Sequence, residues 1–180
     1  MPLPAVRYAP DMSDDCYRGI VSLRAIRSFR EDTLADDDLS AILEAAQWTG
    51  SSKNRQNWSF IVVRDPEQQR RLADCGDFTD PIRNAPVTLA LVQEPEGYEF
   101  DTGRLAQNVM VASGAIGVAS CPITLHREAD AGAVLGLPAG ARCRYAIALG
   151  YASAESGPAR FGGRKPLSEI AFEDRYGRAR

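Results

Sequence analysis

The sequence has very few of the residues that most often bind metal ions. It contains one histidine, His126, and its four cysteines, Cys16, Cys75, Cys121 and Cys143, are widely separated and form no CxxC pair. Structural zinc sites need four such ligands at short spacings, so we predict no metal site. We interpret the cysteines as buried or incidental thiols. One alternative is Cys121 as a nucleophile, with His126 as its base.

A long apolar run and a surplus of positive charge are also missing. No stretch reaches the roughly 18 apolar residues that a membrane span needs. The opening residues, MPLPAVRYAPDMSDD, carry prolines and acids where a signal peptide needs basic and then apolar residues. We therefore expect a cytoplasmic protein without a membrane partner. A formal net charge of −3 at pH 7 argues against nucleic acid as a partner, so any anion site must be local.

Neither GxGxxG after a strand nor GxxxxGK[ST] occurs, so a nucleotide bound here is not held by those loops. With 180 residues, 44% of them hydrophobic, the chain is long enough for one domain with a substantial core. We predict a single domain over residues 1–180. Residues 1–12 contain three prolines and are expected to form an N-terminal arm, and residues 153–180 a linker and C-terminal arm.

Helix signals recur along the chain. We expect Ser13 to cap a first helix and Asp36 a second, and Asp65-Pro66 to open a third that ends near Asp74. A fourth helix is predicted over 101–119, where many residues are small, and a fifth over 127–135. The expected apolar stripes are Leu39, Ile42, Leu43 and Ala46 in the second helix and Leu105, Val109, Ala112 and Ile116 in the fourth.

Short apolar runs predict strands at 59–63, 87–92 and 142–151, and the run 120–126 is a strand or a loop. Helices and strands mix without the strict alternation of a Rossmann domain. This order predicts an α+β sandwich in which a sheet lies between helices.

Polar side chains with a ligand-binding character gather between residues 23 and 58. Arg24 and Arg27 are three residues apart, a spacing that on a helical turn would let both guanidinium groups clamp a phosphate. The loop before the first predicted strand contains Ser51, Ser52, Asn54 and Gln56. Such a loop is suited to binding ligand hydroxyls. The alternatives are a solvated arginine pair and an ordinary surface turn.

This order of motifs resembles the FMN-dependent nitroreductase family, whose corresponding stretches read RRSxRxF and PSxxNxQPW. Here Leu23, Ala25 and Asn57 replace the family's first arginine, its serine and its proline. The stretch 101–121 is similar to the family's DxGxAxQNxxLAAxxxGxGSC. The C-terminal GGRKPLSEIAFEDRYG is similar to KxRKPLEEVVxxExYG, with Arg164 matching the family's arginine and Gly162 replacing its lysine.

The resemblance implies a nitroreductase-like α+β sandwich with a central, mostly antiparallel sheet flanked by helices, assembled as an intertwined homodimer with an extended C-terminal arm. It implies that FMN takes hydride from NADH or NADPH and passes it to a small nitroaromatic, quinone or enone in a ping-pong mechanism. The chemistry would occur at FMN N5, without a catalytic side chain. The residues it implies for FMN binding are Arg24, Ala25, Arg27, Ser51, Ser52, Asn54, Gln56, Pro122, Ile123, Thr124, Leu125 and Arg164.

Two other readings are compatible with the same motifs. In the first, the chain is a specialised relative, such as a dehalogenase-like or flavin-consuming enzyme. In the second, it is a non-catalytic protein that binds flavin or another anion. A yellow protein that NAD(P)H bleaches would favour the enzyme.

Overall fold

The computed structural model of the protein describes residues 14–156 and 163–180. The predicted arm over 1–12, the Ser13 cap and Gly162 lie outside the described residues. The described elements are α1 (Asp14–Ser22), α2 (Asp36–Gln47), η1 (Ser52–Asn54), β1 (Trp58–Val63), α3 (Pro66–Ala73), α4 (Asp80–Asn84), β2 (Val87–Gln93), α5 (Glu99–Ala115), β3 (Ala119–Thr124), α6 (Glu128–Leu135), β4 (Arg142–Gly150) and α7 (Leu167–Ile170).

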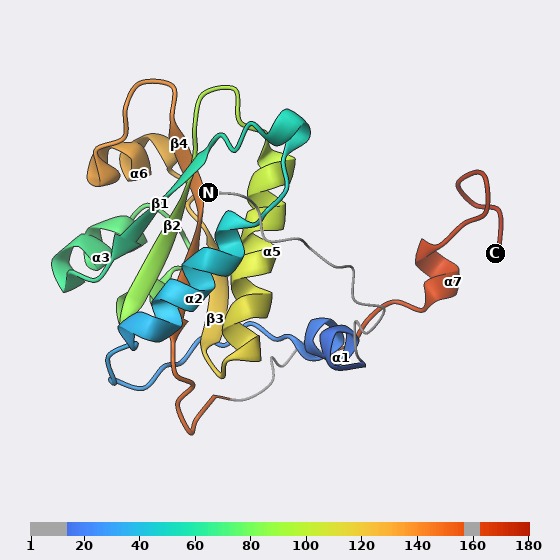
Figure 1. The fold of residues 1–180 in the computed structure, drawn as a ribbon, viewed down its shortest axis with the longest axis horizontal. Helices are drawn as coiled ribbons and strands as arrows, with labels where there is room; N and C mark the ends of the chain where they lie inside the picture. The colour runs from blue at the N-terminus through green and yellow to red at the C-terminus, as the bar shows by residue number, and fades with distance from the viewer. Residues whose placement is uncertain (1–13, 157–162) are drawn as a thin grey trace, which may run out of the picture.

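The four strands form one sheet in the order β1-β2-β4-β3, and every neighbouring pair is antiparallel. Helices α2 and α5 cover one face of the sheet, and α3 and α6 lie on the other side (Figure 1). The predicted α+β sandwich with an antiparallel sheet is therefore confirmed. The run 120–126, left open between strand and loop, forms β3.

The two central strands place large side chains on one face and small ones on the other. Val87, Leu89 and Leu91 of β2 pack with Ile147 and Leu149 of β4 against α2 and α5. The alternate positions, Ala90, Ala146 and Ala148, face a second cluster that includes residues of α3, α4 and α6. Because successive side chains of a strand point to opposite faces, these two strands separate two cores.

Two helix boundaries differ from the prediction. Helix α2 begins at Asp36 itself, after Ala35, and has no side-chain cap, so the predicted Asp36 cap is wrong. Asp36 instead pairs with Arg64 at 2.6 Å. The fourth predicted helix runs over Glu99–Ala115 rather than 101–119, because Gly117 takes a φ of +79° and ends the helix. Ile116 is consequently exposed rather than part of the buried stripe.

The two arginines do not lie on a helical turn. Helix α1 ends at Ser22, and residues 23–28 belong to no helix or strand. The N–H of Ile26 donates to the Ser120 carbonyl at 2.9 Å, and Phe29 forms an isolated bridge with Ala152. The helical argument for the arginine pair is therefore wrong, since long-range backbone pairing overrides the local spacing.

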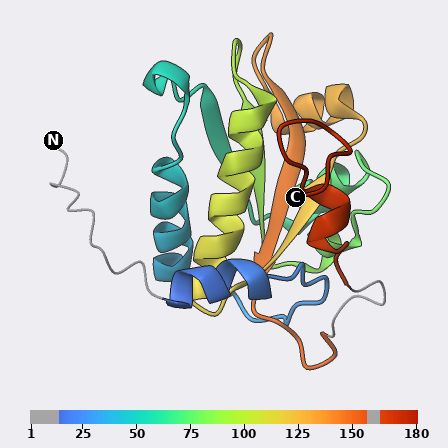
Figure 2. The same cartoon turned by 90° about the vertical axis from the view of Figure 1, so that its right-hand side faces the viewer.

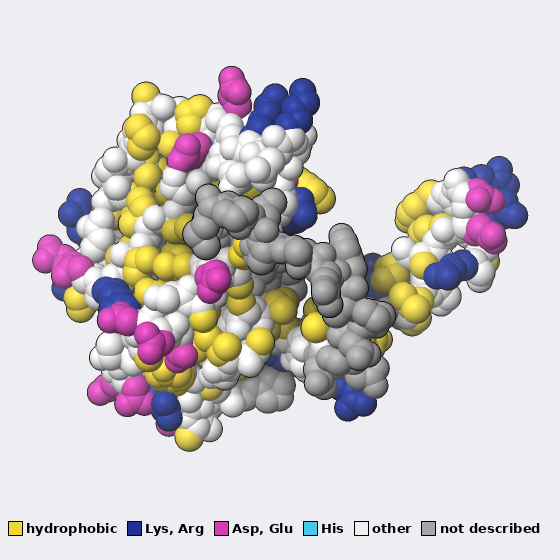
Figure 3. Space-filling model, in the orientation of Figure 1, with side chains coloured by type: hydrophobic (Ala, Val, Ile, Leu, Met, Phe, Trp, Pro, Cys, Tyr) yellow, Lys and Arg dark blue, Asp and Glu magenta, His cyan; other side chains and the backbone are white. Residues whose placement is uncertain are grey.

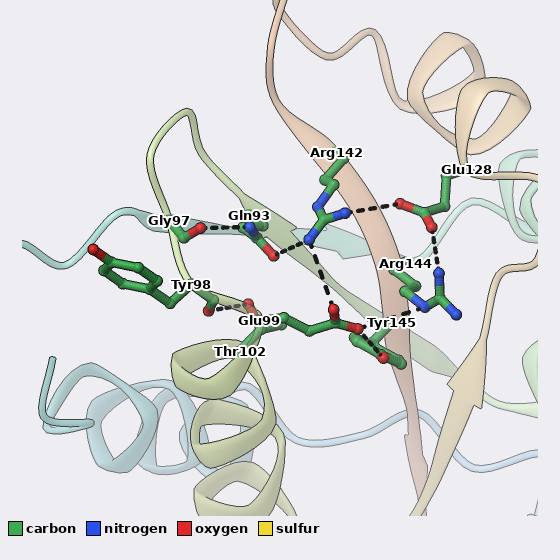
Figure 4. A network of polar contacts seen from close by, with 9 residues as sticks. All are labelled: Gln93, Gly97, Tyr98, Glu99, Thr102, Glu128, Arg142, Arg144 and Tyr145. Atoms are coloured by element: carbon green, nitrogen blue, oxygen red, sulfur yellow. Dashed lines mark hydrogen bonds and ion pairs between the residues drawn. The ribbon is translucent and has the colours of Figure 1, made fainter.

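Polar side chains tie the start of α5 and the start of α6 to β4 (Figure 4). Arg144 binds Glu128 at 2.7 Å and lies 3.6 Å from Glu99, whose carboxylate also accepts from the Tyr145 hydroxyl. The Tyr145 hydrogen bond lowers the pKa of Glu99 and raises that of Tyr145. Arg142 approaches both glutamates.

The C-terminal tail, residues 163–180, lies apart from the sheet and its helices (Figure 1). Its short helix α7 exposes 73% of Leu167 and 57% of Ile170. Within the tail, the ring of Phe172 packs against that of Tyr176, with 4.6 Å between the ring centroids. None of the described helices is long and apolar enough to cross a membrane.

Gly150 is a position where a single added carbon should lower the stability of the fold. A Cβ built there lies 2.6 Å from Pro86 Cδ and 3.0 Å from Phe29 Cδ1. We expect Gly150→Ala to lower the free energy of unfolding by about 1 to 3 kcal/mol. Gly103 of α5 is the matched control, because its Cβ would meet nothing within 4 Å. Gly103→Ala should leave stability unchanged or raise it by up to about 1 kcal/mol. Urea unfolding measures both, and equal effects would contradict the packing argument.

Candidate functional site

A cavity of about 570 Å³ opens at the end of β3. Three parts of the chain supply its walls: the segment 23–28, the turn 74–79 with α4, and β3 with His126. The lining residues are Arg27, Ser28, Asp77, Phe78, Asp80, Pro81, Asn84, Cys121, Pro122, Ile123, Thr124 and His126. Its volume is in the range of small-molecule sites.

Backbone pairing brings Arg27 to this cavity. The hydrogen bond from Ile26 to Ser120 sets segment 23–28 beside β3, and the Ser28 carbonyl accepts from the Ser153 N–H at 3.2 Å. Arg27 lies between these two anchors and lines the cavity. Its guanidinium group therefore supplies positive charge at the site from a held backbone.

Arg127 holds the turn 74–79 in place. Its guanidinium group donates to the carbonyls of Asp74 and Gly76 and binds the Asp77 carboxylate at 2.7 Å. The hydrogen bond from Arg127 keeps the pKa of Asp77 below its usual range. Phe78, next in the turn, is 84% exposed at the cavity. A rigid turn thus presents one carboxylate and one aromatic ring.

His126 is fixed by the same turn. Its Nδ1 accepts a hydrogen bond from the Asp77 N–H at 3.2 Å and lies 3.6 Å from the Asp77 carboxylate. The imidazole does not hydrogen-bond Cys121, whose thiol contacts the Pro122 carbonyl instead. Burial raises the pKa of Cys121, although Arg27 opposes the rise. This arrangement does not support Cys121 as an activated nucleophile.

Some of the residues expected to bind a cofactor come together here. Arg27, Pro122, Ile123 and Thr124 line the cavity. Leu125 is fully buried beneath it, and its N–H donates to the Arg144 carbonyl at 2.8 Å.

The other two predicted residues of this segment, Arg24 and Ala25, do not line the cavity. Arg24 turns its guanidinium group toward the carbonyls of Val21 and Leu23, at 2.9 and 2.8 Å. Ala25 packs against the core.

The loop with Ser51, Ser52, Asn54 and Gln56 lies elsewhere, before β1, and lines no part of this cavity. Ser51 Oγ accepts from the Gln56 N–H at 3.0 Å, and Arg104 of α5 holds the Gly50 carbonyl at 2.6 Å. Three non-glycine residues of the loop have positive φ: Lys53 at 53°, Asn54 at 54° and Gln56 at 52°. Such strain persists where surrounding contacts impose it.

Arg164 is in the tail and donates to its neighbour Gly163. Within one chain, therefore, the predicted cofactor residues lie in three separate regions: the cavity and the segments that border it, the loop before β1, and the tail.

Sequence reasoning missed most of the turn side of the cavity. Asp77, Phe78, Asp80, Pro81 and Asn84 were not predicted as site residues, and His126 was considered only as a partner for Cys121. Asp77, Phe78 and Asp80-Pro81 form a polar turn with one aromatic residue, which is a weak local indication. The described residues contain no group of three or more His, Cys, Asp or Glu side chains that could hold a metal ion.

These features define an α+β protein. Its small-molecule cavity lies at the edge of the sheet and contains an arginine. The family model of the nitroreductase family matches residues 20–75 and 78–151. The chain belongs to the nitroreductase family. The two matched stretches leave out Gly76 and Asp77, in the turn that borders the cavity.

Relatives and solved structures agree with this family. The chain is similar to a putative NADH dehydrogenase/NAD(P)H nitroreductase of Archaeoglobus fulgidus, with 27% identity over 77% of this chain and 86% of the relative. An NADH dehydrogenase of Thermus thermophilus is 27% identical over 88% of this chain and 95% of the relative. The structure of an NADPH:FMN oxidoreductase from Vibrio harveyi complexed with NAD+ superposes with a TM-score of 0.84 and 21% identity, covering 93% of this chain and 80% of the other.

Thiol labelling tests the interpretation that the cysteines are buried or incidental thiols and that Cys121 is not a nucleophile. Cys75, Cys121 and Cys143 are buried, and burial raises the pKa of each thiol, to about 12 for Cys143. A raised pKa lowers the thiolate fraction, so at about pH 8 a disulfide reagent should modify none of them before unfolding. Cys16 is exposed in the chain, and Cys16→Ser removes it as a source of signal. Fast labelling of the Cys16→Ser protein, mapped to Cys121 by mass spectrometry, would restore the nucleophile reading.

Proposed function

We propose that the protein is an FMN-dependent oxidoreductase that takes hydride from NADH or NADPH and reduces a small organic acceptor of the nitroaromatic, quinone or enone type. The observation that carries the proposal is the cavity that places Arg27 beside β3 in a chain of the nitroreductase family. The names of the Archaeoglobus relative and of the Vibrio enzyme support the nicotinamide donor, and the Vibrio name supports FMN.

The side chains of the cavity fit such a cofactor. Arg27 offers a cation for a phosphate or for an electron-rich ring edge, while Pro122, Ile123 and Phe78 offer apolar surface for a flat ring. Ser28, Thr124 and Asn84 add hydroxyl and amide groups. Bound FMN supplies the hydride chemistry, and the protein supplies binding, orientation and charge.

A single cavity of this size favours donor and acceptor entering in turn, which is a ping-pong mechanism. The open turn with Phe78 leaves room above the apolar wall for a planar acceptor. An acceptor would then be selected by size and flatness more than by a dedicated binding group.

The first test is cofactor binding. We expect one FMN per chain, and FMN should bind far better than riboflavin because the arginine charge has no phosphate to bind in riboflavin. Arg27→Ala should weaken FMN several-fold to about a hundredfold, since a charge-assisted hydrogen bond contributes about 1.5 to 3 kcal/mol. Folding should hardly change.

Fluorescence titration with FMN and riboflavin measures this. Arg30→Ala is the matched control, because Arg30 is paired with Asp32 at 2.7 Å and does not line the cavity. A protein that rejects FMN, or an Arg27→Ala variant that unfolds while keeping its affinity, would refute the proposed site. If the protein binds FMN but NAD(P)H does not bleach the bound FMN, the protein is a flavin-binding protein that lacks this catalysis.

We also propose that the chain is one domain that works as a homodimer. The groove between α1 and α5, about 620 Å³ in volume, is lined by Ile20, Leu23, Val111 and small residues of α5. Figure 2 places α1 across the end of α5, and Tyr17, Ile20 and Val21 of α1 remain exposed. Exposed apolar surface of this kind favours a protein partner.

The tail supports the same proposal. Leu167 and Ile170 are exposed, and Figure 3 shows hydrophobic side chains on the tail away from the body. A second copy would cover them, and it would bring its own loop 51–56 and Arg164 as the groups that the cavity of one chain lacks. An arm of this kind typically buries well over about 2,000 Å² in an obligate dimer.

Light scattering should therefore give about twice 19.6 kDa. Removing residues 154–180, or the double change Leu167→Asp with Ile170→Asp, should lower both the dimer fraction and the retention of FMN. Glu169→Gln is the control, because Glu169 is an exposed polar residue of the same helix. A monomer that keeps its FMN would refute the shared site.

A further inference from the structure

Loop 51–56, which carries polar residues expected to bind the cofactor, has a strained backbone. Lys53, Asn54 and Gln56 have φ values of 53°, 54° and 52°, in a region that residues other than glycine rarely adopt. Relaxed conformations of the loop would avoid this cost. The observed conformation therefore depends on the contacts that hold the loop.

The loop is closed on itself and fixed at its far end. Ser51 Oγ accepts from the Gln56 N–H at 3.0 Å, so the position of Ser51 sets the position of the curled backbone. After the loop, the Asn57 carbonyl accepts from the Glu94 N–H at 3.1 Å. The side-chain amide of Asn57 also donates to the Pro95 carbonyl at 2.9 Å. These contacts leave the start of the loop to be held by another group.

Arg104 of α5 holds the start of the loop. Its guanidinium group donates to the Gly50 carbonyl, one residue before Ser51, at 2.6 Å. Figure 1 shows η1 beside the first turns of α5. The guanidinium carbon lies 5.8 Å from the centroid of the Phe100 ring, and Nη1 lies 3.9 Å from the Asp101 carboxylate. The Asp101 side chain is 11% exposed, so water screens its attraction for the arginine only partly.

We propose that Arg104 is a positioning residue of the cofactor site, which holds loop 51–56 in the conformation that binds FMN. The inference rests on the proposed function, because it needs FMN as the ligand of this loop. Arg104 does not line the cavity, and it acts through the Gly50 carbonyl. In the proposed homodimer, α5 of one chain thus prepares the cofactor site of the other.

Preorganisation of the loop connects this contact to affinity. A ligand that binds one conformation has an apparent affinity that is scaled by the fraction of the protein in that conformation. The bond from Arg104 is charge-assisted, and such bonds are roughly twice as strong as neutral ones. Without it, the strained backbone is free to relax. A fall of the competent fraction to about a tenth would weaken FMN binding about tenfold.

Arg104→Met removes the donors and keeps an unbranched apolar side chain. It should raise the Kd for FMN about five- to fiftyfold in a fluorescence titration. With FMN at saturation, the rate at which NADH or NADPH bleaches it should change by less than about twofold, because Arg104 does not line the cavity. Arg70→Met is the matched control and should leave the Kd unchanged. Arg70 donates to the Pro66 carbonyl on the surface of α3 and does not line the cavity.

Two further measurements separate positioning from a general structural role. Light scattering and urea unfolding give the dimer fraction and the folded fraction of Arg104→Met under the conditions of the titration, and both should match those of the wild type. An unchanged Kd would overturn the proposal. A rise in Kd that follows from fewer dimers or from less folded protein would overturn it as well.

Gly50→Ala changes the same contact from the other side. A Cβ at residue 50 would lie 3.0 Å from Arg104 Nη2, at the far end of a flexible side chain, so the guanidinium group shifts while the fold is kept. Gly50→Ala should therefore also raise the Kd for FMN. The double variant should bind FMN no more weakly than Arg104→Met alone, because both changes remove one bond. Additive effects would overturn the proposal.

Hydrogen exchange followed by mass spectrometry gives a readout that needs neither FMN nor turnover. In the full-length protein without FMN, Arg104→Met should speed exchange within residues 50–57 at least about threefold, because the loop opens more often. Residues 87–93 of β2 should exchange as in the wild type. Equal exchange of residues 50–57 in the variant and the wild type would contradict the role of Arg104.

Failure of the proposed function would look different. A wild-type protein that does not bind FMN would refute the proposed function, whereas hydrogen exchange would still report whether Arg104 holds the loop. A wild-type protein that binds FMN and is bleached normally, together with an Arg104→Met variant of unchanged Kd, would refute only the inference about Arg104.

Discussion

The unequal size of side chains on the two faces of the β2–β4 pair is the constraint on which the rest of the structure depends. Leucine, isoleucine and valine fill the face under α2 and α5, whereas Ala90, Ala146 and Ala148 occupy the other. Small residues let neighbouring segments come close to a sheet. Phe29 packs into this second core, and Gly150 leaves the space that its ring and Pro86 occupy.

Close approach on the small-residue face has a direct consequence for the cavity. The segment that ends at Phe29 is drawn against the sheet and pairs with β3 through Ile26. Arg27 is next along the chain, so these backbone contacts set its position at the cavity.

The negative charge of Asp77 at the cavity is balanced by Arg127, which binds the turn 74–79. Arg127 neutralises Asp77 and at the same time satisfies carbonyls that would otherwise lack partners, so the turn is rigid without a helix or strand of its own. Arg27 lines the same cavity, and its charge acts on the Cys121 thiol. A cavity with an arginine, an apolar wall and an oriented imidazole suits a planar ligand that carries negative charge.

The sequence by itself determined the class of the fold and one side of the site. Apolar runs predicted β1, β2 and β4, the Asp65-Pro66 pair predicted the start of α3, and the motif around Arg27 pointed to a residue that does line the cavity. These features are local, because strand alternation, helix capping and motif spacing are set by neighbours in the chain.

Only the tertiary structure decided how the arginines and the turn are used. Arg24 and Arg27 have a helical spacing, yet the segment that carries them is not a helix, because Ile26 bonds to a strand far along the chain. Arg27 lines the cavity, whereas Arg24 turns to the carbonyls of Val21 and Leu23. Asp77, Phe78 and His126 come together because Arg127 ties one loop to the end of β3. Contacts between residues distant in sequence carry no periodic signal, so they become visible only when the chain is folded.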